Sequence, residues 1–90
     1  MKIWWLSFCD DSLPQGSQFI GVCIVAGKDF LNAVKNTHLL KINPGGEVAG
    51  VEIPEKFIHA ISPYKNKLLS VAESWKIDAI LNNLNCRVPI

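Results

Sequence analysis

The sequence has little charge, and the charges that it has nearly cancel. Only 19% of the 90 residues are charged, and nine lysines and arginines against eight aspartates and glutamates leave a formal net charge of +1. A chain without a strong positive field has no general attraction for nucleic acid or for an anionic membrane. We therefore expect neither nucleic acid nor a membrane as a partner.

Familiar metal and nucleotide motifs are absent as well. The two histidines lack zinc-ligand spacing to each other or to cysteine, and adjacent carboxylates such as Asp10 and Asp11 are usually solvated. The sequence has neither a P-loop nor the glycine pattern of dinucleotide-binding folds. We therefore expect no metal, no cofactor and no catalytic residue. An enzyme that acts on nucleotides through a cysteine or a carboxylate is the open alternative.

Cysteines are few, and long hydrophobic runs are missing. Cys9, Cys23 and Cys86 are an odd number without C-x-x-C spacing, and two of them lie in apolar runs where free thiols pack as small hydrophobic groups. This pattern is typical of a reducing compartment, so we expect a cytoplasmic protein. The apolar start is too short for a signal peptide, and no run of about 18 apolar residues predicts a membrane-spanning helix.

Apolar residues are abundant instead. They make up 49% of a chain of 90 residues, a length that buries only about 60–65% of the unfolded surface in one domain. Such a chain gains stability when part of its apolar surface lies in a subunit interface. We therefore expect residues 1–90 to form one domain, and that domain to form a homo-oligomer.

The first half of the chain predicts two strands, a helix and a third strand. Residues 2–9 are bulky and aromatic, and residues 18–25 are apolar on both faces, as in a central strand. Apolar residues at helical spacing predict a helix over residues 29–38, with Asp29 as a suitable N-cap. Period-two alternation over residues 48–53 then predicts a strand that ends at Pro54.

The last third predicts two helices. Pro54 suits the first position of a short helix that Ser62 and Pro63 stop, and Ser70 with Glu73 matches a capping box before a helix over 71–81. We expect the tail from Cys86 to add an edge strand or to pack on a neighbour. The predicted class is α+β, with a small antiparallel sheet of three to four strands and two to three helices, in the order β-β-α-β-α-α.

Adjacent tryptophans in the first strand point to opposite faces of the sheet. We expect the face with Trp4, Leu6 and Phe8 to enter the core, which leaves Trp5 and Ser7 on the other face. An exposed tryptophan is able to stack on a base or to lie in an oligomer interface.

The stretch Asn-Pro-Gly-Gly-Glu at residues 43–47 is the most distinctive candidate for a binding site. The backbone N–H groups around its glycines are able to converge on a phosphate or carboxylate, with the asparagine side chain as a further donor and acceptor. Pro-Gly-Gly is also ordinary turn chemistry, so a plain connection is the alternative. The candidate ligand-binding residues, with two cations for charge-assisted contacts, are Trp5, Ser7, Lys41, Asn43, Gly45, Gly46, Glu47 and Arg87.

Three segments together carry a resemblance over most of residues 1–53. They are the opening Trp-Trp-Leu-Ser-Phe-Cys-Asp at 4–10, the run Gln-Phe-Ile-Gly-Val-Cys-Ile-Val at 18–25, and Ile-Asn-Pro-Gly-Gly-Glu-Val at 42–48, with Asp-Phe-Leu between the last two. With these segments, the chain resembles short bacteriophage and prophage proteins without an assigned activity. The resemblance implies a counter-defence role, either as a sponge for nucleotide messengers of bacterial immunity or as an inhibitor that docks on a host protein.

Residues and resemblance together predict a non-catalytic binder, an oligomer that sequesters a small anionic, nucleotide-like ligand in the cytoplasm of the infected host. A cyclic nucleotide or an ADP-ribose derivative is the expected ligand, with Asn43 and the loop glycines at its phosphate or ribose and Trp5 at its base. The alternative is an interaction module that inhibits a host protein through an apolar patch around Trp4 or Trp5 and Trp75.

Overall fold

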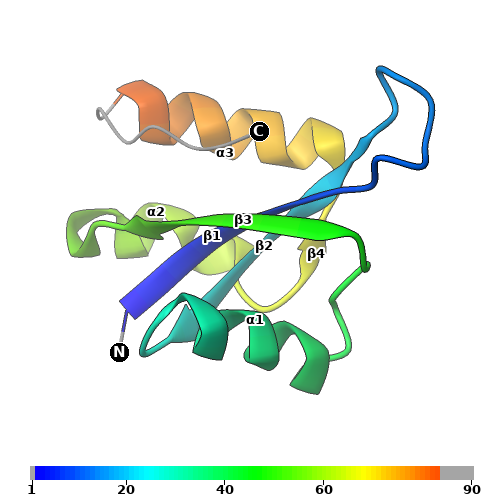
Figure 1. Cartoon of the computed structure of the whole chain (residues 1–90). Helices are drawn as coiled ribbons and strands as arrows, with labels where there is room; N and C mark the ends of the chain where they lie inside the picture. The colour runs from blue at the N-terminus through cyan, green and yellow to red at the C-terminus, as the bar shows by residue number, and fades with distance from the viewer. Residues whose placement is uncertain (1, 84–90) are drawn as a thin grey trace.

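The chain forms a four-stranded antiparallel sheet with helices on both of its faces (Figure 1). The elements, in chain order, are β1 (Lys2–Cys9), β2 (Phe19–Gly27), α1 (Phe30–Leu39), β3 (Glu47–Ile53), α2 (Ile58–Ile61), β4 (Leu68–Leu69) and α3 (Val71–Asn83). The computed structural model describes the backbone of residues 2–83 and the side chains of residues 2–79. The predicted α+β class and element order are confirmed, with β4 as an addition before α3.

The strands lie in the order β3-β1-β2-β4, so β1 and β2 are central. Leu6 of β1 lies opposite Cys23 of β2 on one side and opposite Gly50 of β3 on the other. The central position of β2 was expected, because a strand with two apolar faces needs cover on both. β3 forms one outer edge, and the two residues of β4 form the other.

Two buried clusters lie on the two faces of the sheet. On the face that α1 covers, Ala33 packs with Leu6, Phe8, Cys23 and Val25. On the opposite face, α2 and α3 cover a second and larger cluster. Its buried members are Ile3, Trp5, Val22, Ile24, Ile53, Phe57, Ile61, Leu69 and Ile77.

The predicted core face of β1 is buried, but the prediction that the opposite face lies outside the core is wrong. Leu6 and Phe8 are buried as expected, but Trp5 is 0% exposed and Ser7 is 2% exposed on the other face. Trp4 is half-buried, and its Nε1 donates to the Gly27 carbonyl at 3.0 Å. Alternation alone does not choose between two faces when helices cover both of them.

Side-chain caps begin the two longer helices as predicted. Asp29 Oδ1 accepts a hydrogen bond from the Asn32 N–H at 2.8 Å, which caps α1. At α3, the Glu73 N–H donates to Ser70 Oγ and the Ser70 N–H donates to Glu73 Oε1, both at 3.2 Å. These bonds satisfy donors that the first turn leaves unpaired. α3 continues to Asn83, two residues past the predicted end.

The chain between β3 and α3 differs in detail from the prediction. Pro54 precedes a 3-10 turn at Glu55–Phe57 that leads directly into α2, and a second 3-10 turn, Ser62–Tyr64, follows. β4 was not predicted, because two residues are too few to show alternation. The predicted edge strand of the tail lies outside the described residues. None of the described helices is long and apolar enough to cross a membrane.

Candidate functional site

The predicted binding loop between α1 and β3 uses the polar groups of Asn43 internally. Asn43 Nδ2 donates to Thr37 Oγ1 at 2.9 Å, and Asn43 Oδ1 accepts from the Gly45 N–H at 2.8 Å. The backbone N–H groups of Ile42 and Asn43 both donate to the Thr37 carbonyl, at 3.0 and 3.2 Å. The asparagine therefore closes the connection from α1 to β3, as the plain-turn alternative requires.

The two loop glycines have backbone conformations that other residues rarely adopt. Gly45 has φ +86° and Gly46 has φ +76°. A Cβ on Gly46 would also collide with the carbonyl oxygen of Cys9, whereas a Cβ on Gly45 would meet nothing within 4 Å. Both glycines are thus explained by the turn, and anion binding at the loop stays a prediction.

The structure separates the predicted site residues into two groups. Lys41, on the loop, and Glu47, the first residue of β3, are exposed on either side of the glycines. Trp5 and Ser7 are buried in β1, and the Ser7 hydroxyl lies 3.4 Å from the Ala49 carbonyl that accepts from it. Trp5 is therefore unable to stack on a ligand at the surface, which corrects its predicted role. Arg87 lies outside the described residues.

The residues considered for catalysis or metal binding do not gather. Burial raises the pKa of the Cys23 thiol to about 12, so the nucleophilic thiolate is disfavoured at neutral pH. His38 and His59 are exposed in different helices. Among the described residues, no three histidine, cysteine or acidic side chains lie close enough to hold a metal ion.

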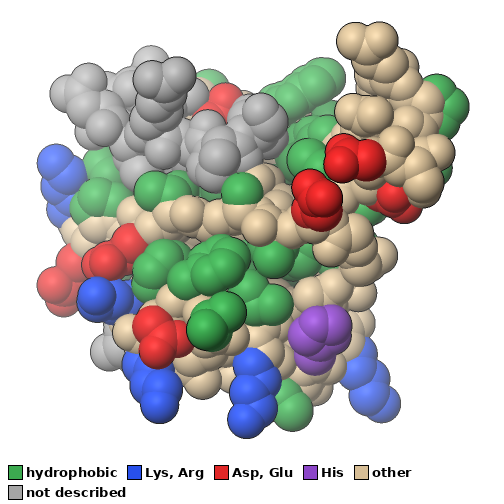
Figure 2. Space-filling model, viewed as in Figure 1, with side chains coloured by type: hydrophobic (Ala, Val, Ile, Leu, Met, Phe, Trp, Pro, Cys, Tyr) green, Lys and Arg blue, Asp and Glu red, His purple; other side chains and the backbone are tan. Residues whose placement is uncertain are grey.

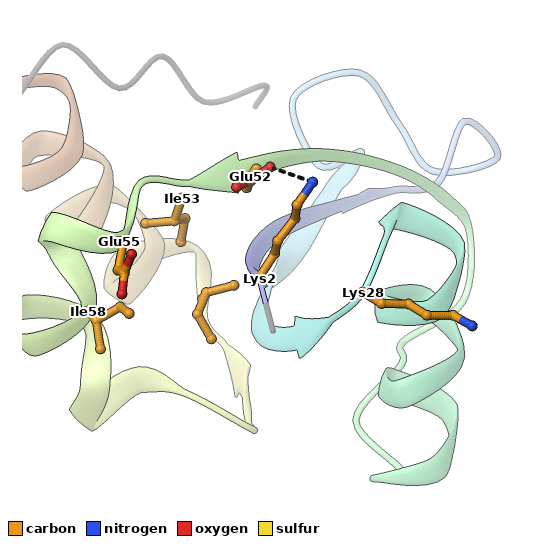
Figure 3. Close-up of a pocket in the computed structure, with 7 residues that line it drawn as sticks. Lys2, Lys28, Glu52, Ile53, Glu55 and Ile58 are labelled. Carbon is orange, nitrogen blue, oxygen red and sulfur yellow. Dashed lines mark ion pairs between the residues drawn. The ribbon is translucent and has the colours of Figure 1, made fainter.

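An open cleft lies at the end of the sheet where β1 starts and β3 ends (Figure 3). Its volume is about 440 Å³. Its apolar surface comes from three isoleucines and its rim from two lysines and two glutamates. The lining residues are Lys2, Ile3, Lys28, Glu52, Ile53, Glu55 and Ile58.

The charges of the cleft are balanced but not all paired. Lys2 Nζ lies 3.5 Å from Glu52 Oε1, and both side chains are about half exposed. Their ion pair spans β1 and β3, where Trp4 and Glu52 are opposite each other. Lys28 and Glu55 make no ion pair with a described residue. Lys28 lies on the opposite side from Glu55, and its amino end points away from the other labelled residues (Figure 3).

This arrangement suits a ligand that carries an apolar group, hydrogen-bond donors and an anionic group. Aliphatic walls bind flat apolar groups, carboxylates accept from hydroxyl and amine donors, and lysines bind anions. No local sequence pattern predicts this cleft, because Lys2, Lys28 and the pair Glu52 and Glu55 come from three separate segments. Only the register of β1 and β3 brings Lys2 and Glu52 together.

The fold and the cleft define a small α+β protein with a ligand-sized depression at a sheet end. No protein-family model matches the chain, and no curated protein and no solved structure is significantly similar to it.

Proposed function

We propose that this protein is a non-catalytic binder that sequesters a small nucleotide-like ligand in the cleft at the end of β1 and β3. The cleft combines an isoleucine surface with two lysines and two glutamates, and this combination is the observation that supports the proposal. Its volume of about 440 Å³ lies within the range of about 300–1,000 Å³ that small-molecule sites occupy.

Each part of such a ligand has a counterpart in the lining. The base would lie mainly on Ile58, which is half-buried, with the largely buried Ile3 and Ile53 at the base of the cleft; these side chains need no particular hydrogen-bond pattern. The Glu55 carboxylate would accept from ribose hydroxyls, as acidic residues do in dinucleotide-binding folds. Lys28, which has no ion pair with a described residue, would bind a phosphate. The balanced charge favours a nucleotide over inorganic phosphate.

The resemblance to phage proteins supplies the setting for this proposal. A protein that binds a cyclic nucleotide or an ADP-ribose derivative and does not turn it over lowers the free concentration of that messenger. In an infected bacterium, this would make the chain a counter-defence sponge in the host cytoplasm. Sequestration needs no general acid or base, so the inert Cys23 is compatible with it.

The test is a binding screen that also returns the ligand. The purified chain is incubated with cyclic dinucleotides, cyclic trinucleotides and ADP-ribose derivatives, its melting temperature is measured, and the ligand released by heating is identified by mass spectrometry. A stabilised chain that returns its ligand intact supports the proposal. A chemically altered ligand would instead establish an enzyme, and no shift across the panel would contradict nucleotide binding.

Matched variants test whether the ligand binds in the cleft. Lys28→Ala and Glu55→Gln should each weaken binding about tenfold or more, the scale of one charge-assisted hydrogen bond. Lys35→Ala and Asp11→Asn change charges that are also exposed but do not line the cleft, and should leave the affinity unchanged. Equal affinity in all four variants would remove the cleft assignment.

The host-protein alternative needs a different surface from the one predicted. Trp5 is buried, and Trp75, which is 60% exposed, belongs to α3, on the opposite face of the sheet from Trp4. These residues therefore form no single patch. A highly exposed apolar residue on the α1 side is Leu31, at 76%, which follows Phe30, the residue that contacts β3. A pull-down from host lysate that loses one stoichiometric partner with Leu31→Glu would favour this second function.

A further inference from the structure

β3 presents an edge that is suited to pairing with another strand. It has seven residues, and its pairing with β1 is regular along its length. No strand among residues 2–83 pairs with its outer side. Every second residue of such an edge turns its N–H and C=O outward, and a regular edge without proline is a template for a further strand.

Apolar side chains adjoin this edge on the α1 face. We call them the α1–β3 surface, which consists of Trp4, Phe30, Leu31, Val34 and Val48. Leu31 is 76% exposed, and the other four are half-buried against the cluster beneath α1. Figure 2 shows hydrophobic side chains gathered between β3 and α1 on this face. An apolar area that adjoins a free strand edge is typical of an interface.

We propose that a second copy of the chain pairs with this edge, antiparallel, about a two-fold axis at Gly50. In that register Gly50 lies opposite Gly50 of the second copy, and Val48 lies opposite its Glu52. Glu47 likewise lies opposite Ile53, so no two carboxylates face each other across the pair. Like charges directly opposite would destabilise pairing, and the sequence of β3 avoids them in this register.

The contact between α1 and β3 fits the same axis. The Phe30 ring covers Gly50, since a Cβ on Gly50 would lie 2.6 Å from Phe30 Cε1. An axis perpendicular to the sheet keeps both α1 helices on one face, and paired strands lie about 4.8 Å apart. The Phe30 and Leu31 side chains of the two copies would therefore meet over the axis and bury Leu31, the most exposed leucine among residues 2–79.

The pairing also brings together the two candidate binding segments, a consequence that rests on the proposed function. Ile53 lines the cleft, and Glu47 of the second copy would lie opposite it. The loop that contains Lys41, Gly45 and Gly46 of the second copy would then border the mouth of the cleft. Each site would take lysines from both copies, and the predicted loop residues would contribute in the dimer.

The test is the mass of the full chain in solution, measured by light scattering and sedimentation over a concentration series. The wild type should have twice the chain mass of 10.0 kDa. Leu31→Glu and Val48→Lys should yield folded monomers, verified by circular dichroism. Leu39→Glu is the matched control, because Leu39 is 69% exposed in the same helix but lines a depression with Val25 and Asn66, away from β3.

A wild-type monomer at every concentration would overturn the proposal, as would equal loss of the dimer in Leu39→Glu. The register is tested by isotope-filtered NMR on a mixed-label dimer, which should show contacts between Ala49 of one copy and Val51 of the other. A dimer without these contacts uses another surface and also overturns it. Ligand binding that is unchanged by Lys41→Ala in an intact dimer would remove only the shared site, whereas Lys28→Ala tests the proposed function itself.

Discussion

Phe30, the first residue of α1, packs its ring directly on Gly50 in the middle of β3. A Cβ on Gly50 would lie 2.6 Å from Phe30 Cε1 and 2.7 Å from Leu6 Cδ2, both closer than real Cβ contacts. The backbone of Gly50 is not in the left-handed region, so the requirement for glycine is one of space. The missing side chain thus lets α1 reach across β1 to the outer strand.

Gly50→Ala should therefore destabilise the fold by overpacking. We expect a loss of about 1–3 kcal/mol in the free energy of unfolding, measured by denaturant titration. The added methyl group has to displace the Phe30 ring or the Leu6 side chain, both of which are fixed by packing.

The double variant Phe30→Leu with Gly50→Ala is the control for this contact. A smaller side chain at position 30 leaves room for the methyl group, so the pair should cost less than the sum of the single changes by at least about 0.5 kcal/mol. Strict additivity, or a neutral Gly50→Ala, would contradict the close packing of α1 on β3.

The elements of this fold were predictable where their signals are local. Asp29, Ser70 and Glu73 mark helix starts by capping bonds between residues three positions apart, and the structure has those bonds. The orientation of β1 was not predictable in the same way. Trp5 is buried because α2 and α3 cover its face, which no local pattern in residues 2–9 reports.

The candidate site was less predictable than the fold for the same reason. The adjacent glycines Gly45 and Gly46 predict a binding loop from the sequence, yet their positive φ angles and the hydrogen bonds of Asn43 explain them as a turn. Lys28 and Glu55 line the same cleft only because the fold brings their segments to one end of the sheet. Residues that come together only in the tertiary structure have no characteristic spacing in the sequence, so no motif predicts them.

Asn43→Ala is expected to lower stability whether or not the loop binds a ligand. The change removes two side-chain hydrogen bonds, to Thr37 and to the Gly45 N–H, and the hydroxyl of Thr37 that loses its donor is buried in α1. We expect a loss of about 1–3 kcal/mol in the free energy of unfolding. Thermal and denaturant unfolding measure it.

Thr37→Val provides the second arm of a double-variant cycle with Asn43→Ala. Coupling between the two changes of about 0.5–1.5 kcal/mol would confirm that Asn43 acts through Thr37. If Asn43→Ala kept full stability and lost only ligand affinity, the turn interpretation of the loop would be wrong.

The capping box of α3 should give part of the stability a defined pH dependence. The Ser70 backbone N–H, and then its hydroxyl, lower the pKa of Glu73 in the folded state. Because the folded pKa lies below the unfolded value, this stabilisation is present above the unfolded pKa and is lost as the pH falls through the folded one. Melting temperatures of the wild type and of Glu73→Gln should therefore differ at pH 7 and converge at pH 3.

Ser70→Ala separates the cap from the charge. It removes the hydroxyl that accepts from the Glu73 N–H, so it should cost about 1 kcal/mol at pH 7. A melting temperature of Glu73→Gln that lies below the wild type by the same amount at both pH values would show that the carboxylate charge plays no part.

Cys23 should be protected from alkylation until the chain unfolds, while Cys9 reacts in the folded state. Cys23 is 0% exposed in the cluster beneath α1, and burial raises its pKa to about 12. Cys9 is half-buried at the end of β1. Iodoacetamide at pH 8 followed by peptide mapping should give a fast rate at Cys9 and a rate at Cys23 that tracks global unfolding.

The raised pKa of Cys23 also predicts that the free energy of unfolding falls at alkaline pH. An unfolded cysteine ionises near pH 9, whereas folded Cys23 holds its proton to about pH 12. Its contribution is therefore complete below pH 9 and declines as the pH rises from there through 12. Cys23→Val should flatten this decline relative to the wild type in unfolding titrations at pH 8 and pH 10.5. Alkylation of Cys23 at the rate of Cys9, or identical declines in both proteins, would contradict the closed packing of α1 on the sheet.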